Sequence, residues 1–196
     1  MEQSVNRESP QGLDGYPAIA LPPGWLSWRL VMARALKQAH LAGKRGEVPI
    51  GAVVIDGLTG RILGEAGNSP IGLCDPTAHA EILALRQACE AARNYRLPGV
   101  ILAVTLEPCL MCLGAMVHAR IAGLVFGAPD PKAGAVVSRL EGASLPFLNH
   151  HFPVLKGVLA DQCGGMLTRF FANRRKTQGS ALTRQGTESP GLPPGD

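Results

Sequence analysis

The feature that most limits the possible folds of this chain is the alternation of short β-rich runs with longer segments of helical periodicity. Apolar residues recur at helical spacing over 24–42, and two strand-like runs, 50–56 and 61–66, follow with a Gly-containing connection typical of a hairpin. We then expect helices over 79–92, 109–120 and 161–176, and strands over 100–106, 122–128 and 153–159. This order predicts an α/β fold, a three-layer α/β/α domain with a central mixed five-stranded sheet.

The two ends of the chain differ from this patterned part. Residues 1–22 and 177–196 are rich in Gly, Pro, Ser and Gln and show little periodicity, so we expect disordered tails there. The segment between them, 23–176, is long enough to bury the core of one domain. The sequence therefore predicts one folded domain between two tails.

Charge and cysteine content indicate the type of binding partner and the cellular location to expect. A net charge of +4 and a sequence pI near 9.0 favour a polyanionic partner such as a nucleic acid. The five cysteines are an odd number, and the first residues lack the basic and apolar regions of a secretory signal, so we expect reduced thiols and a cytoplasmic location. No run approaches the roughly 18 apolar residues of a membrane span, so we expect a soluble protein.

The stretch TLEPCLMC, residues 105–112, carries two cysteines at a predicted strand-to-helix junction. Pro108 suits the start of a helix, and Cys109 and Cys112 are three residues apart, so they share one helical face. The unpaired amides and the dipole at a helix N-terminus stabilise thiolates, which bind cations. The pair therefore suits zinc, and it suits a redox pair equally well.

A second segment, PTAHAE, supplies further candidate ligands at residues 76–81. If the N-terminus of this helix lies next to the N-terminus of the helix that carries the cysteines, His79, Cys109 and Cys112 point toward one place. A zinc ion with three protein ligands keeps its fourth position for water, which is the catalytic pattern. Such binding lowers the pKa of the water to about 7, and Glu81 would lie beside it as a proton carrier that is not a ligand.

Cys74 offers an alternative use of the same residues. It stands five residues before His79, so Cys74, His79, Cys109 and Cys112 could together close a structural Cys₃His site without water. Glu81 would then have no evident role. The residues alone leave both arrangements open.

Together, the H-A-E and P-C-x-x-C motifs match the signature of the zinc-dependent cytidine and nucleotide deaminase superfamily. The chain most closely resembles the bacterial tRNA adenosine deaminases of that superfamily. The blocks that carry this resemblance are EVPIGAVV (47–54), GNSPIG (67–72), DPTAHAEILALRQA (75–88), NYRL (94–97), TLEPCLMCLGAMVHARI (105–121), VFGAPDPKAG (125–134), NHHFPV (149–154) and FFANRR (170–175).

The resemblance implies a cytidine-deaminase-like fold for residues 23–176 and one zinc ion per subunit, held by His79, Cys109 and Cys112. It implies hydrolysis of the wobble adenosine, position 34 of a tRNA anticodon stem-loop, to inosine, with Glu81 as the catalytic residue. An arginine tRNA is the expected substrate. The resemblance further implies a homodimer and gives no reason to expect binding to DNA.

The resemblance also implies substrate contacts, each of which has a simpler structural interpretation. Asn68 would contact the adenine, Asp130 the ribose hydroxyls and His150 the anticodon loop, although Asn68 and Asp130 also suit turns and His150 also suits an exposed surface. Arg174 and Arg175 would bind backbone phosphates, or form a solvated helix end. Pro129 and Pro131 replace an Arg and a non-proline residue of the relatives, so we expect a stiffer loop with one cationic contact fewer.

Two other functions are compatible with these residues. One is a deaminase of the same superfamily that acts on a free base such as guanine or cytosine. The other is an RNA-binding protein without activity that uses zinc only to fold. Glu81 argues against the second, because a structural site needs no proton carrier.

Overall fold

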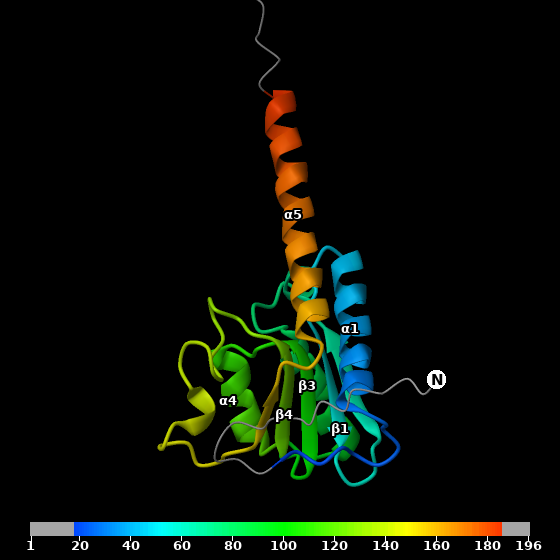
Figure 1. Cartoon of the computed structure of the whole chain (residues 1–196), viewed down its shortest axis with the longest axis vertical. Helices are drawn as coiled ribbons and strands as arrows, with labels where there is room; N and C mark the ends of the chain where they lie inside the picture. Colours follow the sequence, from blue (N-terminus) through cyan, green and yellow to red (C-terminus); the bar gives the residue numbers. More distant parts are fainter. Residues whose placement is uncertain (1–17, 186–196) are drawn as a thin grey trace, which may run out of the picture.

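The structure, a computed structural model, describes residues 18–185 and the side chains of residues 18–177. It confirms the predicted sheet of five strands between layers of helices (Figure 1). The elements, in chain order, are α1 (Trp28–Lys44), β1 (Gly51–Asp56), β2 (Ile62–Gly67), α2 (Pro70–Leu73), α3 (Ala80–Ala92), β3 (Val100–Leu106), α4 (Leu110–Ala119), β4 (Gly123–Ala128), the 3₁₀ turn η1 (Gly142–Ser144), β5 (Val154–Lys156) and α5 (Ala160–Gln185).

The sheet is mixed, with the strand order β2-β1-β3-β4-β5. β1 is antiparallel to both of its neighbours, whereas β3, β4 and β5 are parallel to one another. The antiparallel pair β1/β2 is a hairpin. Parallel strands need a longer crossover connection, and α4 provides it between β3 and β4. Among the described residues, no helix is both long and apolar enough to cross a bilayer.

Side chains of the strands alternate between two apolar cores, one on each face of the sheet. Val53, Ile55 and Ala103 point to the core that α1 and the start of α5 cover. On the other face, Val54 and Leu102 join the core beneath α3 and α4. Both faces are buried, which explains why the strands are almost continuously apolar.

Glycines allow two helices to lie very close to the sheet. A Cβ atom at Gly51 would collide with the carbonyl of Ala35 in α1, and one at Gly64 would collide with the carbonyl of Ala84 in α3. Residues without a side chain are therefore required at these positions. The close packing of α3 on β2 sets the position of the N-terminus of α3, which is where His79 lies.

The structure departs from the sequence predictions near both ends. Residues 18–22, predicted as part of a disordered tail, include Ile19 and Leu21, which pack against the core on the α1 face because burial of their apolar side chains is favourable. Helix α5 continues past Lys176 to Gln185, since no proline occurs before Pro190. The rest of the predicted tails, 1–17 and 186–196, lies outside the described residues.

Two smaller differences concern single elements. β5 covers only 154–156 of the predicted 153–159, because Gly157 takes a left-handed conformation with φ +85° and ends the strand. The short helix α2 lies between β2 and α3, in a segment for which the sequence analysis predicts no helix.

Candidate metal centre

Most of the candidate site residues gather at one edge of the sheet. β2, β3 and β4 all end at this edge, since Gly67 pairs with Gly51 at the start of β1, and Leu106 pairs with Ala128. Asn68 follows β2, Cys109 follows β3 and Asp130 follows β4. The carboxyl ends of strands in open α/β sheets are the usual place for a binding site.

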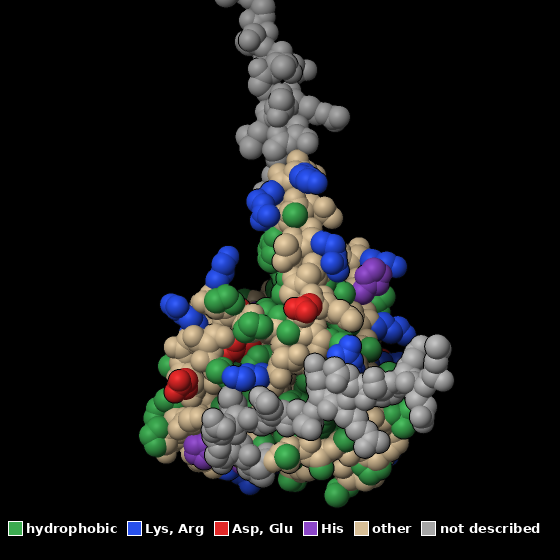
Figure 2. All heavy atoms as spheres, in the orientation of Figure 1, with side chains coloured by type: hydrophobic (Ala, Val, Ile, Leu, Met, Phe, Trp, Pro, Cys, Tyr) green, Lys and Arg blue, Asp and Glu red, His purple; other side chains and the backbone are tan. Residues whose placement is uncertain are grey.

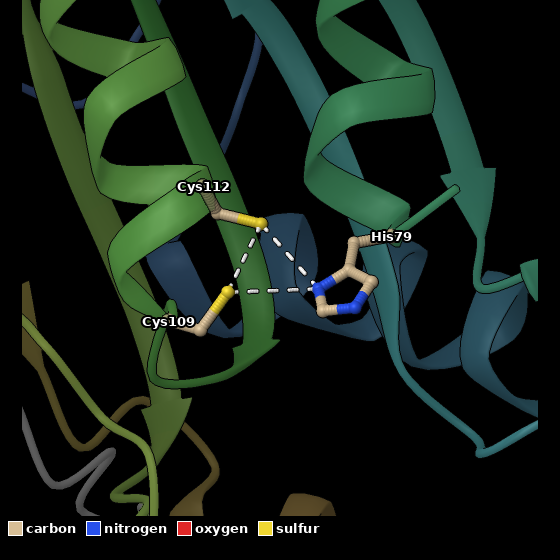
Figure 3. Close-up of side chains that lie close together, drawn as sticks. All are labelled: His79, Cys109 and Cys112. Carbon is tan, nitrogen blue, oxygen red and sulfur yellow. Dashed lines mark hydrogen bonds between the residues drawn. The ribbon is translucent and has the colours of Figure 1, made fainter. Parts of the chain in front are cut away.

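Three ligand atoms converge between the N-termini of α3 and α4 (Figure 3). His79 caps α3 and Cys109 caps α4, both with extended backbone and with side chains that bond to no amide of their own helix. The Nδ1 of His79 lies 3.7 Å from the Sγ of Cys109 and 3.6 Å from the Sγ of Cys112, and the two sulfurs are 3.7 Å apart.

These distances fit a tetrahedral zinc ion. Zinc bonds of about 2.3 Å to sulfur and about 2.0 Å to nitrogen place two sulfurs about 3.8 Å apart and a sulfur and a nitrogen about 3.5 Å apart. One imidazole and two thiols are also the donor types that zinc prefers. The predicted convergence of His79, Cys109 and Cys112 is therefore confirmed, and it is Nδ1 of the histidine that faces the two sulfurs.

Cys74 does not belong to this group. It is exposed at the end of α2, and its thiol donates to the carbonyl of Ile71. The group of potential metal ligands among the described residues holds only the three residues above. The closed Cys₃His alternative is therefore wrong, and three protein ligands leave one tetrahedral position for another molecule.

The three candidate ligands hold their protons with different strength. The hydrogen bond between the two sulfurs, together with His79, lowers the pKa of Cys109 to about 4. The same hydrogen bond to Cys109 raises the pKa of Cys112, and Cys109 raises the pKa of His79. At a helix N-terminus, where backbone amides stabilise negative charge, Cys109 favours the thiolate form, whereas Cys112 and His79 would release protons when a metal cation binds.

Glu81 lies beside the metal ligands without being one of them. Its side chain, 4% exposed in the first turn of α3, interacts with the Cys112 thiol. Burial raises the pKa of Glu81, although the nearby His79 opposes this effect. A carboxyl group with a raised pKa next to a metal centre is suited to accept and return a proton.

Asn68 connects the end of β2 to the helix that carries His79. It is 4% exposed, and its Oδ1 accepts a hydrogen bond of 2.8 Å from the N–H of Ala80 in the first turn of α3. This bond fixes the orientation of the amide, so its NH₂ group points away from the helix end. The role in local structure is observed, and the contact with adenine stays a prediction.

Asp130 has a turn role as well. Its Oδ1 accepts hydrogen bonds from the N–H groups of Lys132 and Ala133, and its carbonyl accepts one from Gly134. Among the described residues, Oδ2 accepts no hydrogen bond, and the side chain is partly exposed at the site edge. The contact of Asp130 with a ribose therefore stays a prediction that the geometry permits.

Two buried glutamates that hold the loops of the site had no side-chain role in the sequence analysis. The carboxylate of Glu47 accepts hydrogen bonds from the amides of Ile71 and Gly72 in α2. Burial alone would raise the pKa of Glu107, but hydrogen bonds from Ser138, Val137 and Asp130 together hold it below its ordinary value. The only sequence signal for either residue is an acid next to an apolar strand.

The remaining predicted substrate residues lie away from the metal centre. His150 precedes β5 at the opposite edge of the sheet, where its Nε2 lies 2.7 Å from the carbonyl of Ile121. Arg174 and Arg175 are exposed on α5, which extends from the site edge past the end of α1 (Figure 1), and basic side chains follow this helix (Figure 2). Contacts of these three residues with RNA stay predictions.

Comparisons with known proteins agree with this geometry. Residues 27–128 match the family model of the cytidine and deoxycytidylate deaminase zinc-binding region. The tRNA-specific adenosine deaminase of Haemophilus influenzae is 48% identical over 146 residues, which cover 74% of this chain and 84% of that protein.

Two solved structures are also similar. One, from a study of A-to-I editing by tRNA:A34 deaminases at the wobble position of transfer RNA, is 47% identical with a TM-score of 0.68 and covers 70% of this chain and 99% of its own. The guanine deaminase of Bacillus subtilis is 36% identical with a TM-score of 0.51, and covers 53% of this chain and 66% of its own.

Proposed function

The chain belongs to the cytidine and deoxycytidylate deaminase zinc-binding family, and from this premise we propose that it is a tRNA-specific adenosine deaminase. Its reaction is the hydrolysis of the wobble adenosine, position 34 of the anticodon, to inosine and ammonia. The observation that carries this proposal is the convergence of His79, Cys109 and Cys112 beside the buried carboxyl group of Glu81. Similarity to tRNA-specific relatives supports the choice of substrate.

His79, Cys109 and Cys112 would hold one zinc ion per subunit. A bound zinc ion supplies the Lewis acidity that activates water at neutral pH. Glu81 accepts the proton of the attacking water and delivers protons to N1 of the adenine and to the departing amino group. Water thus adds its oxygen to C6, and the amino group leaves as ammonia.

The two loops at the site edge would bind the nucleotide. Asn68, oriented by its bond to Ala80, presents its NH₂ group to acceptors of the base. Asp130 accepts hydrogen bonds from the ribose hydroxyls, and recognition of the 2′-hydroxyl favours RNA over DNA. The exposed side chains of Arg174 and Arg175 bind phosphates of the anticodon stem.

We further propose a homodimer and a cytoplasmic location. A mainly apolar groove between α3 and α4 supports the first, since a second copy would bury this surface. Apolar side chains such as Ile82, Leu85 and Ala115 line it, together with the charged or titratable side chains of Arg86, Glu90 and His118. The need for reduced thiols at Cys109 and Cys112 supports the second, because cytosolic thiols stay reduced.

The decisive experiment is incubation of the zinc-loaded protein with an RNA anticodon stem-loop of an arginine tRNA that carries adenosine 34. We expect inosine at position 34 after nuclease digestion and mass spectrometry, and no product from the corresponding DNA stem-loop. The similarity to a guanine deaminase makes free guanine the relevant competitor. Turnover of guanine without formation of inosine would replace this proposal with a free-base deaminase.

A further inference from the structure

Glu107 occupies the short turn that connects β3 to α4. Leu106 is the last residue of β3, and Pro108 and the metal ligand Cys109 follow directly. The side chain of Glu107 is only 2% exposed. A buried carboxylate is costly unless its oxygens are hydrogen-bonded, so both oxygens of Glu107 require donors.

The partners of Glu107 all belong to the loop that follows β4. Its Oε1 accepts the N–H groups of Val136, Val137 and Ser138 at 3.2, 2.7 and 2.8 Å. Its Oε2 accepts the N–H of Asp130 at 3.0 Å and also the hydroxyl of Ser138. The loop therefore wraps around one carboxylate with five donor groups.

Backbone hydrogen bonds reinforce the same junction. The N–H of Glu107 donates to the carbonyl of Ala128, and the N–H of Ala135 donates to the carbonyl of Pro108, both at 2.9 Å. A Cβ atom at Gly134 would collide with the carboxylate of Glu107, which explains why residue 134 has no side chain. The turn before Cys109 and the loop of Asp130 thus form one hydrogen-bonded unit.

The two prolines around Asp130 increase the importance of the hydrogen bond between the N–H of Asp130 and Glu107. Pro129 and Pro131 have no N–H, so the amide of Asp130 is the only backbone donor among residues 129–131. That single donor is bonded to Glu107. The other hydrogen bonds of Asp130 among the described residues stay within its own loop, so the bond to Oε2 of Glu107 is the one that ties Asp130 to the turn before Cys109.

We propose that Glu107 is a positioning residue, which fixes the loop of Asp130 relative to the metal centre and thereby determines how the ribose of the substrate is held. Glu107 acts through Asp130 and touches no reacting atom. The inference rests on the proposed function, in which Asp130 contacts the ribose. It goes beyond that function because it gives a buried acid, which itself makes no contact with the substrate, a part in the recognition of RNA.

Glu107→Gln tests this role directly. The NH₂ group of the glutamine would face the N–H of Asp130, and two donors cannot bond to each other. We expect KM for the RNA stem-loop to rise at least about tenfold, with a smaller change in kcat and unchanged zinc content. Preference for adenosine over 2′-deoxyadenosine at position 34 should fall in parallel. Unchanged KM and unchanged sugar preference would overturn the proposal.

A double variant and a matched control separate positioning from general destabilisation. If Glu107 acts through Asp130, the variant with both Glu107→Gln and Asp130→Asn should show the KM of Asp130→Asn alone, and additive effects would contradict the proposal. Ser138→Ala removes the hydroxyl but keeps the bond to the amide of Asp130, so its KM should stay within about twofold of wild type. A large rise for Ser138→Ala would count against the bond to Asp130.

Hydrogen exchange supplies a readout that does not require deamination. In Glu107→Gln, exchange at the amides of Asp130, Val136 and Val137 should accelerate at least about tenfold, while exchange in α3 stays unchanged. If Glu107→Gln does not fold, Gly134→Ala, which displaces the carboxylate, should accelerate the same amides; unchanged exchange would refute the inference. Failure of the wild-type protein to form inosine would instead refute the proposed function.

Discussion

The Nδ1 of His79 lies 3.6 Å from the Sγ of Cys112, although the two residues are 33 positions apart in the chain. Each belongs to the first turn, or the cap, of a helix that begins at the same edge of the sheet. The sheet therefore brings two helix N-termini together, and a metal ion held by these residues joins α3 to α4.

Removal of zinc should destabilise the protein. A ligand that binds only the folded state adds to its stability, so treatment with a strong chelator should lower the melting temperature by at least about 5 °C. His79→Ala should reduce the zinc content of the purified protein to well below one ion per chain, as measured by plasma mass spectrometry. Cys74→Ala is the matched control, because that thiol lies outside the metal group. Loss of zinc in Cys74→Ala would contradict the three-ligand site.

Glu81→Gln should abolish most of the activity without loss of zinc. The amide keeps the size of the buried side chain but cannot carry a proton, so we expect kcat to fall by about 10² to 10⁴. Glu141→Gln, at an exposed position in the loop before η1, should leave kcat unchanged. Single-turnover formation of inosine measures both variants, and near wild-type kcat in Glu81→Gln would exclude the assigned proton carrier.

The metal centre could be predicted from the sequence because its signals are local. Each candidate ligand lies at or near the predicted start of a helix, where the helical pattern replaces that of a strand or loop. The order of strands and helices predicts that these helix starts lie at the same edge of the sheet. The convergence of His79, Cys109 and Cys112 therefore follows from the sequence. Their distances and the exclusion of Cys74 needed the fold, because the turn that directs Cys74 outward has no pattern in the sequence.

The roles of Glu47 and Glu107 could not be predicted for a different reason. Their partners are backbone amides of distant loops, and an amide leaves no trace in the residue type that carries it. Ile19 and Leu21 stand among prolines and glycines, a composition that predicts a disordered tail, although both side chains pack on the core. Long-range contacts determine the roles of both glutamates and the order of the two apolar residues, which composition alone does not reveal.

The groove between α3 and α4 predicts how the dimer can be broken. Ala115 lies in this groove on α4, so Ala115→Arg should place a charge in an apolar interface and convert the dimer into a monomer. Light scattering after gel filtration measures the mass directly. Leu58→Arg, at a highly exposed position in the β1/β2 turn, should leave the mass unchanged. A wild-type protein that is monomeric at micromolar concentration would remove the dimer proposal.

The hairpin turn between β1 and β2 should weaken in acid. The carboxylate of Asp56 accepts the amides of Thr59 and Leu58, and these hydrogen bonds lower its pKa. Because the folded pKa is depressed, the added stability is present above the unfolded value of about 3.9 and is lost as pH falls through the folded value. The stability advantage of wild type over Asp56→Asn, measured by urea unfolding, should therefore be larger at pH 6 than at pH 3. An advantage that does not change with pH would contradict this role.

The basic surface of α5 predicts a salt-dependent step in substrate binding. If Arg174 and Arg175 each bind one phosphate, replacement of both by alanine should raise KM for the stem-loop and lower the slope of log KM against log salt by about 1.4 to 1.8. kcat at saturating RNA should change little, because neither side chain lies at the metal centre. Arg29→Ala provides the comparison, since this exposed residue begins α1 at the opposite edge of the sheet. An equal salt slope in wild type and the α5 variant would show that the helix does not hold the RNA backbone.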